Sequence, residues 1–164
     1  STATDIRFGI VRIGGRLRVT NGSSPDRRVD EAVLRHLSEV FGRLDPVAGT
    51  SLFPANRQES LVIEFETDYY PDTIETVRLE IRVYTDGTFH ITYLETYLGA
   101  RRYCRWDRHE QDHNSRDHFH PLPDASTTCA VDRTYPVDVT AVLRETVLPW
   151  VNDRLGDLWD TDSS

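Results

Sequence analysis

The hydrophobic and polar residues of this chain alternate in a way that predicts an antiparallel sheet in its central part. In residues 77–83, aliphatic residues alternate with charged ones, so one face of this strand should be buried and the other wet. Asp86-Gly87 is a strong signal for a hairpin turn, and Gly99 permits a second turn. The predicted strands are 61–67, 76–84, 88–97 and 101–107. Because the connections are short, neighbouring strands should run antiparallel, as a meander.

A helix is predicted on each side of this sheet in the sequence. Between residues 30 and 44, hydrophobic residues recur at spacings of three and four, and Asp30 is placed to act as the N-cap. A second hydrophobic stripe predicts a closing helix over residues 139–155, and Pro149 should kink or divide it.

The other segments carry weaker patterns. Residues 47–60 and 108–126 show no period and contain prolines, so both are predicted as loops, whereas residues 127–131 are expected to add an edge strand. The N-terminal segment is predicted to form a hairpin of two short strands, 8–13 and 16–20.

The fold class that follows is α+β. An antiparallel meander with an N-terminal hairpin should be packed by two helices, about 30–44 and 139–155, on one face. A chain of 164 residues has the length of one domain, which we expect over residues 1–156, followed by an acidic C-terminal tail over 157–164.

The charge of the chain indicates its environment. It carries 27 acidic and 19 basic residues, a net charge of −8, and every basic residue is arginine. Acidic residues without lysine favour a halophilic cytoplasm as the location. The N-terminal residues lack the pattern of a signal peptide, and no hydrophobic run is long enough to span a membrane, so no membrane partner is expected. Net negative charge argues against nucleic-acid binding, but concentrated salt weakens that argument.

One segment differs from the rest of the chain. Residues 101–120 hold five arginines and four acids, for a local charge of +1, and four of the six histidines. Common phosphate-binding, nucleophile-elbow, dinucleotide and zinc-protease motifs are absent, which argues against the usual ATPases, Rossmann oxidoreductases and serine hydrolases. The chemistry of this protein is therefore expected in the histidine-rich segment.

Three interpretations of this segment stay open. In the first, neutral imidazoles bind zinc or another divalent metal, with His118 and His120 on the same side of an extended segment. The metal ligands would be His109, His113, His118 and His120. In the second, two histidines cleave a phosphodiester as general base and general acid, which requires groups that titrate near neutral pH. In the third, the histidines are polar residues of an exposed loop.

The acid–base interpretation assigns a role to each group. Asp107 or Asp117 would fix an imidazole tautomer, and Arg108 or Arg116 would stabilise the charge that builds on the phosphorane. The candidate catalytic residues are His109, His118, His120, Asp107 and Arg108. His90 is expected at a solvated position on the polar face of its strand.

The sequence from Tyr103 through Trp106-Asp107 and His109 to His118-Phe119-His120 resembles the TumE-like toxin family. The resemblance covers roughly residues 61–155, and the matching residues are Trp106, Asp107, His109, His118 and His120. In two places the chain departs from the family pattern. Arg108 stands where that family typically has Asn, and Glu110 follows His109 in place of a second histidine.

The resemblance implies the toxin component of a toxin–antitoxin pair, with an antitoxin protein as partner. Combined with the acid–base interpretation, it leads to the hypothesis of a His-dependent, metal-independent ribonuclease that acts on RNA. The alternative is a non-catalytic interaction module in which the histidine segment binds a structural zinc. The ribonuclease hypothesis requires no cofactor. The interaction-module alternative requires zinc.

Overall fold

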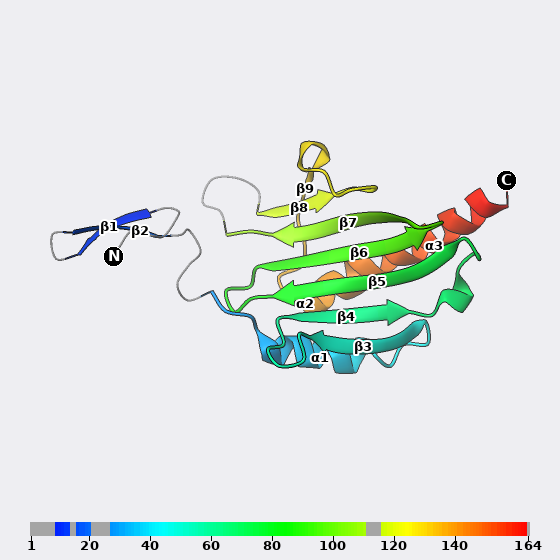
Figure 1. The fold of residues 1–164 in the computed structure, drawn as a ribbon, viewed down its shortest axis with the longest axis horizontal. Helices are drawn as coiled ribbons and strands as arrows, with labels where there is room; N and C mark the ends of the chain where they lie inside the picture. The colour runs from blue at the N-terminus through cyan, green and yellow to red at the C-terminus, as the bar shows by residue number, and fades with distance from the viewer. Residues whose placement is uncertain (1–8, 14–15, 21–26, 111–115, 164) are drawn as a thin grey trace.

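The chain forms a seven-stranded antiparallel sheet in which the strands follow one another in sequence order (Figure 1). The computed structural model describes residues 9–13, 16–20, 27–110 and 116–163. The strands are β3 (Val47–Phe53), β4 (Ser60–Phe65), β5 (Ile74–Val83), β6 (Phe89–Tyr97), β7 (Ala100–Arg108), β8 (Asp117–His120) and β9 (Val131–Arg133). Every neighbouring pair is antiparallel, which confirms the predicted meander.

The predicted N-terminal hairpin is also present. Strand β1 (Gly9–Ile13) pairs with β2 (Arg16–Thr20) as a separate two-stranded sheet, with Ile13 opposite Arg16.

The first helix, α1 (Glu31–Phe41), forms where the spacing of hydrophobic residues predicts it. The Asp30 carboxylate accepts a hydrogen bond from the Val33 N–H at 3.2 Å and so caps the helix. The residues that α1 buries are Leu34, Leu37 and Phe41. The helix ends at Phe41, three residues before the expected end, because the chain turns at Gly42 towards β3.

The closing helix is divided near Pro149, as predicted. It consists of α2 (Val139–Val142), a π-helical turn η3 (Leu143–Val147) and α3 (Leu148–Asp162). Pro149 lies in the first turn of α3, where its missing N–H costs little, and the π-helical turn precedes it. Helix α3 continues past the expected end at residue 155 because Leu158 is buried against the core. None of the described helices is both long and apolar enough to cross a membrane.

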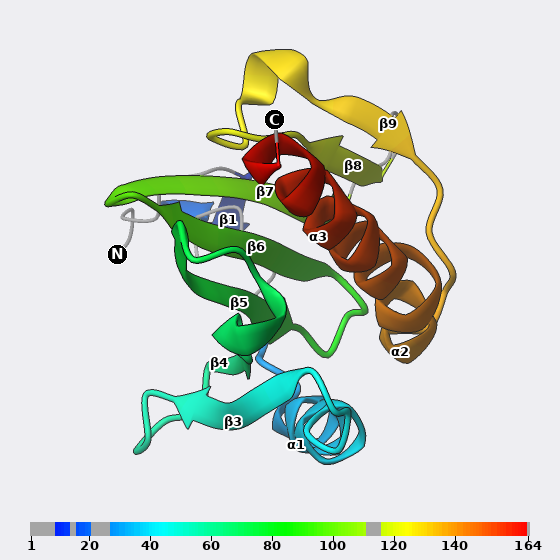
Figure 2. The same ribbon diagram turned by 90° about the vertical axis from the view of Figure 1, so that its right-hand side faces the viewer.

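Helices α1 and α3 pack on the same face of the sheet (Figure 2), and the strands turn their hydrophobic residues towards them. In β6 and β7, the buried residues on this face include Phe89, Ile91, Tyr93, Cys104 and Trp106. Trp150 of α3 lies edge-on to Tyr93 and Trp106, with ring centroids 4.9 and 5.3 Å apart. We call the opposite face, which neither helix covers, the open face of the sheet.

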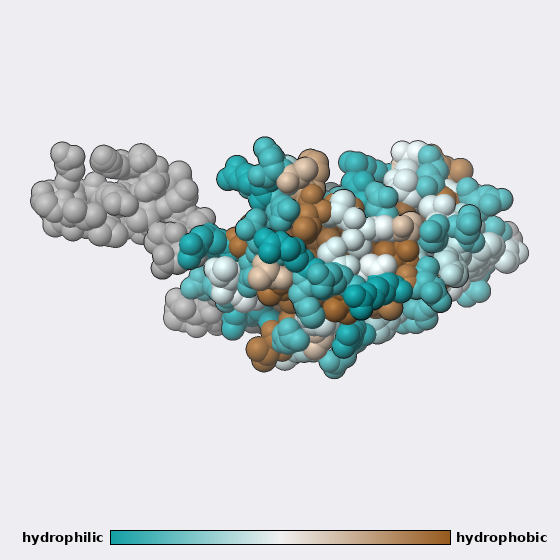
Figure 3. Space-filling model, turned by 90° about the horizontal axis from the view of Figure 1, so that it is seen from below, coloured by the Kyte–Doolittle hydropathy of each residue, from teal (hydrophilic) through white to brown (hydrophobic). Residues whose placement is uncertain are grey.

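The surface around α1 and the edge strand β3 is largely polar. Viewed from the α1 side of the molecule, it is mostly hydrophilic, with hydrophobic residues in separate patches (Figure 3). The apolar stripe of α1 is turned inward, since its buried residues are Leu34, Leu37 and Phe41.

Two loop predictions were wrong. Residues 47–53 form the edge strand β3, whose half-exposed residues do not show the alternation of a strand with one buried face. Residues 117–120 form β8, which extends the sheet beside β7. The short His-rich sequence of β8 has no strand signal of its own. It forms a strand because it pairs with β7. The predicted edge strand at 127–131 lies slightly later, as β9, after the 3-10 turn η2 (Thr127–Cys129).

Candidate active site

The buried Asp107 carboxylate of β7 is the centre of a group of histidines on the open face. Its side chain is 0% exposed. Oδ1 lies 2.7 Å from Nδ1 of His90, and Oδ2 accepts a hydrogen bond from Nε of Arg105 at 2.7 Å. Nε2 of His120 lies 3.1 Å from Oδ2, and Nε2 of His109 lies 3.8 Å from it. We call Asp107, Arg105, His90, His109, His118 and His120 the histidine cluster.

Strand register explains why these residues meet. Asp107 is paired with His90 of β6 on one side and with His118 of β8 on the other. Arg105 lies two residues before Asp107 on the same face, and its partner in β8 is His120. Directly opposed residues on one face of an antiparallel pair have Cβ atoms about 4.5–5.5 Å apart. The sheet itself therefore gathers the cluster from three strands.

The imidazole rings lie side by side and differ in their access to solvent. The His109 ring centroid is 5.7 Å from that of His90 and 5.6 Å from that of His118, and the His118 and His120 centroids are 6.4 Å apart. The side chains of His90, His109 and His118 are 30%, 38% and 20% exposed, but that of His120 is only 7% exposed. A molecule on the open face can therefore reach the first three rings.

The buried His120 ring faces Asp107 and has little contact with solvent. Neither ring nitrogen makes an aligned hydrogen bond within the described part of the chain, although Nε2 lies at ion-pair distance from the Asp107 carboxylate. His118 is held from another direction, because its Nδ1 lies 3.2 Å from Oδ1 of Asp132, on the solvent-exposed side of β9.

The electrostatics of the cluster keep the carboxylate charged. Burial opposes the ionisation of Asp107, but hydrogen bonds from His90 and Arg105 outweigh it and hold the pKa of Asp107 below its ordinary value. The pKa of His109 is also lowered, first because burial disfavours its charged form. The attraction of Asp107 opposes this effect, and the neighbouring imidazoles add to it. At neutral pH the cluster therefore combines a carboxylate anion with a neutral His109.

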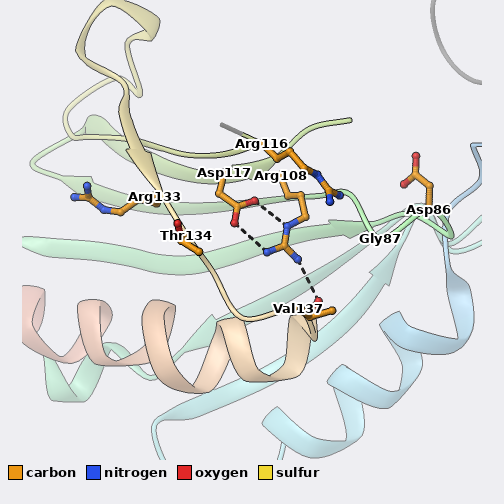
Figure 4. Close-up of a pocket in the computed structure, with 8 residues that line it drawn as sticks. All are labelled: Asp86, Gly87, Arg108, Arg116, Asp117, Arg133, Thr134 and Val137. Atoms are coloured by element: carbon orange, nitrogen blue, oxygen red, sulfur yellow. Dashed lines mark hydrogen bonds and ion pairs between the residues drawn. The ribbon is translucent and has the colours of Figure 1, made fainter. Parts of the chain in front are cut away.

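Arg108 does not lie with the histidines. Because side chains alternate along β7, Arg108 points to the helix-covered face, where its Nε and one Nη bind the Asp117 carboxylate at 2.8 and 3.0 Å. The guanidinium also donates to the backbone carbonyls of Tyr135, Pro136 and Val137, and Figure 4 shows it directed at Asp117 and Val137. The expected role of Arg108 at a phosphorane therefore does not fit this geometry. The Asp117 carboxylate binds Arg108 and accepts a hydrogen bond from the Tyr135 N–H at 2.8 Å, so it lies with Arg108 and not in the histidine cluster.

Arg105 takes the position expected of Arg108. The same alternation that separates Arg108 from Asp107 places Arg105 beside it, on the face opposite Trp106. Arg105 Nε binds Asp107, whereas its two terminal nitrogens make no hydrogen bond to any described residue. The signal for Arg105 was thus present in the sequence pattern.

His90 is the second residue that sequence reasoning missed. It was expected to be solvated, but its Nδ1 faces Asp107. The turn between β6 and β7 has two residues, Leu98 and Gly99, with φ of 47° and 84°, and it pairs Tyr97 with Ala100. Counting back along both strands from that turn pairs His90 with Asp107. The register could therefore have identified His90 from the sequence.

The proposed metal ligands are only partly described. His113 lies outside the described residues, and His118 and His120 lie on one face, as their spacing predicts. Among the residues that the structure describes, no group of three or more His, Cys, Asp or Glu side chains has an arrangement suited to a metal ion.

Comparison with known protein families places this fold and site in context. A family model described as Toxin TumE matches residues 35–155, a range that begins in α1, ends in α3 and contains the whole histidine cluster. No curated protein matches the chain, and no solved structure matches it.

Proposed function

The chain belongs to the TumE toxin family, and from this premise we propose that its histidine cluster is a site of RNA cleavage. Membership makes the chain the toxin component of a toxin–antitoxin pair, with a cognate antitoxin as its partner. The proposal concerns how the toxin acts. The observation that carries it is the buried Asp107 carboxylate surrounded by imidazoles on an uncovered face of the sheet.

The reaction needs a base and an acid but no external nucleophile. The ribose 2′-oxygen attacks the adjacent phosphorus, the bond from phosphorus to the 5′-oxygen breaks, and a 2′,3′-cyclic phosphate and a 5′-hydroxyl are formed. One imidazole takes the 2′-hydroxyl proton, and another gives a proton to the departing 5′-oxygen. Imidazole suits both steps because it titrates near neutral pH.

His109 and His118 are best placed for these two roles. Both reach solvent, and their ring centroids are 5.6 Å apart. The lowered pKa of His109 keeps it neutral and so able to accept a proton, which assigns it as the base. His118, held at Nδ1 by Asp132, presents its other nitrogen as the acid. His120 is too buried to touch the substrate and acts as a positioning residue through Asp107.

Two further groups support these steps. The Asp107 carboxylate accepts the Nδ1 proton of His90 and fixes the orientation of that ring. Arg105 is held through Nε, so its terminal nitrogens can bind the oxygens of the phosphorane. The carboxylate therefore aligns a cation and several imidazoles at one place.

The test is the toxicity of a chain in which His118 and His120 are both replaced by alanine. We expect the double variant to fold and to lose growth inhibition, because the acid and the support of Asp107 are removed. Circular dichroism and thermal unfolding check the fold, and the single variant His118→Asn covers the case in which loss of the buried His120 disturbs it. His36→Ala, on the exposed side of α1, is the control and should stay toxic. Unchanged toxicity of a folded double variant would contradict the proposal.

Direct measurement of RNA cleavage separates the proposal from the interaction-module alternative. Purified toxin should cleave RNA in the presence of a chelator and leave 2′,3′-cyclic phosphate ends. Stoichiometric zinc in elemental analysis, together with absence of cleavage, would favour the structural-zinc interpretation. The halophilic cytoplasm stays a prediction from composition.

A further inference from the structure

A row of polar side chains crosses the open face at right angles to the strands. Arg82 of β5 is paired with His90 of β6, His90 with Asp107 of β7, and Asp107 with His118 of β8. Residues paired in this way point to the same face of the sheet. Adjacent strands lie about 4.8 Å apart, so the backbone position of Arg82 is roughly 14 Å from that of His118. The histidine cluster thus continues across the sheet towards β5.

A polar cavity lies at the β5 end of this row. It has a volume of about 290 Å³. Its lining residues are Ser60, Glu80, Arg82, His90 and Thr92, which come from β4, β5 and β6. His90 belongs to both the cavity and the histidine cluster, so the two are directly adjacent.

Arg82 is the arginine that lines this cavity, and among the described residues the acid beside it, Glu80, pairs with Arg78 instead. Arg82 is exposed and has no hydrogen bond or ion pair to any residue that the structure describes. The nearest arginines along and across the sheet differ from it, because Arg78 binds Glu80 at 2.9–3.0 Å and Arg105 binds Asp107. A cation of this kind beside hydroxyl groups suits a phosphate ester and its sugar.

We propose that this cavity is a subsite for the nucleotide next to the cleaved phosphate and that Arg82 binds the phosphate of that nucleotide. The proposal rests on RNA being the substrate. A single strand would cross the open face along the row, with the reacting ribose between His109 and His118 and the neighbouring nucleotide at His90 and Arg82. Thr92 and Ser60 place hydroxyl groups beside the sugar. Arg82 contributes to binding and not to the chemical step.

The experiment measures binding without cleavage. The probe is a short, fluorescently labelled 2′-O-methyl RNA, which lacks the nucleophilic hydroxyl, and the readout is fluorescence anisotropy with the full chain. Arg82→Ala should weaken binding about tenfold. Each lost phosphate contact lowers the slope of log affinity against log salt by about 0.7 for a single strand, and the variant should show that change. Arg35→Ala on α1 removes the same charge from the opposite side of the sheet and should leave affinity within about twofold.

A second measurement reports on the cavity itself. Addition of a nucleoside 3′-monophosphate should shift the NMR signals of the His90 ring in the wild-type chain, and the shift should be lost in Arg82→Ala. Equal affinities of the wild type and Arg82→Ala, or equal losses in Arg82→Ala and Arg35→Ala, would overturn the subsite.

Cleavage of unmodified RNA distinguishes the two proposals. If Arg82→Ala weakens binding but the wild type cleaves no RNA, the subsite stands and the catalytic function fails. If the wild type cleaves RNA and Arg82→Ala cleaves it with unchanged kcat/KM, the function stands and the subsite fails. A raised KM with unchanged kcat is the result that supports both.

Discussion

Two buried carboxylates lie on neighbouring strands of the sheet and face opposite sides. Asp107 of β7 lies on the open face, and Glu95 of β6 lies on the face covered by α3, where it is 1% exposed. Glu95 accepts hydrogen bonds from Tyr93 at 2.7 Å and from Arg154 at 2.7 and 2.9 Å, and Arg102 lies at ion-pair distance. Asp107 has one arginine, and imidazoles take the other positions around it.

The different partners of the two carboxylates indicate different roles: Glu95 stabilises the fold, and Asp107 supports the candidate site. Arginine stays charged at every physiological pH, so the Glu95 group is a permanent link between α3 and the sheet. Burial opposes the charge of Glu95, but hydrogen bonds from Arg154 and Tyr93 hold its pKa below the ordinary value. Burial and the nearby Glu95 charge also raise the pKa of Tyr70 to about 12. Imidazoles exchange protons near neutral pH, so the Asp107 group can take part in proton transfer.

The largest expected effects come from neutralising each carboxylate. Asp107→Asn should lower the rate of RNA cleavage about 10²–10⁴-fold, since it misaligns the imidazoles and the Arg105 guanidinium. Its free energy of unfolding should fall by only about 1–3 kcal/mol, because His90 and Arg105, which are about one-third exposed, regain water. Glu95→Gln should lower the free energy of unfolding by about 3–5 kcal/mol, because two arginines lose their buried anion. Its cleavage rate per folded molecule should stay near that of the wild type.

Urea unfolding and single-turnover cleavage, measured on both variants, check this pair. The comparison fails if Glu95→Gln loses cleavage in its folded state or if Asp107→Asn remains as active as the wild type.

A smaller pair of effects follows from the arginines. Under the proposed function, Arg105→Gln removes the cation that would bind the phosphorane and should reduce kcat about 10²-fold. It should change the free energy of unfolding by less than about 1 kcal/mol, since the side chain is one-third exposed. Arg154→Gln should leave kcat unchanged and lower the free energy of unfolding by about 2–3 kcal/mol through its lost bonds to Glu95. Similar stability losses in the two variants would remove the distinction between the two faces.

The sequence carried most of the information that separates these faces. Alternation in residues 77–83 correctly divided buried from polar residues, and the turns at Gly87 and Gly99 predicted the meander. Extended past Tyr93, the same alternation places Glu95 on the buried face, but a carboxylate there gives no sign of its partner Arg154, which is 59 residues away.

The candidate site was predictable as far as local geometry defines it. Asp107, His109 and the pair His118 and His120 were identified and do meet, and the two-residue turn at Leu98-Gly99 also encodes the contact with His90. The pairing of β7 with β8 was not predictable, because residues 109–116 connect them and no turn motif sets the register. The burial of His120 depends on that pairing.

The smallest expected effect concerns His109 and the pH dependence of stability. Its folded-state pKa lies below the ordinary value of 6.5, so between these two values the unfolded chain binds more protons than the native one, and stability falls as pH falls through that window. The carboxylates, whose pKa values are also lowered, contribute stability that is lost only at more acidic pH. His109→Asn should therefore lose less stability than the wild type as the pH is lowered from 6.5, measured by urea midpoints. Parallel pH profiles of the wild type and His109→Asn would show that His109 responds to pH no more than the arginines around Glu95 do.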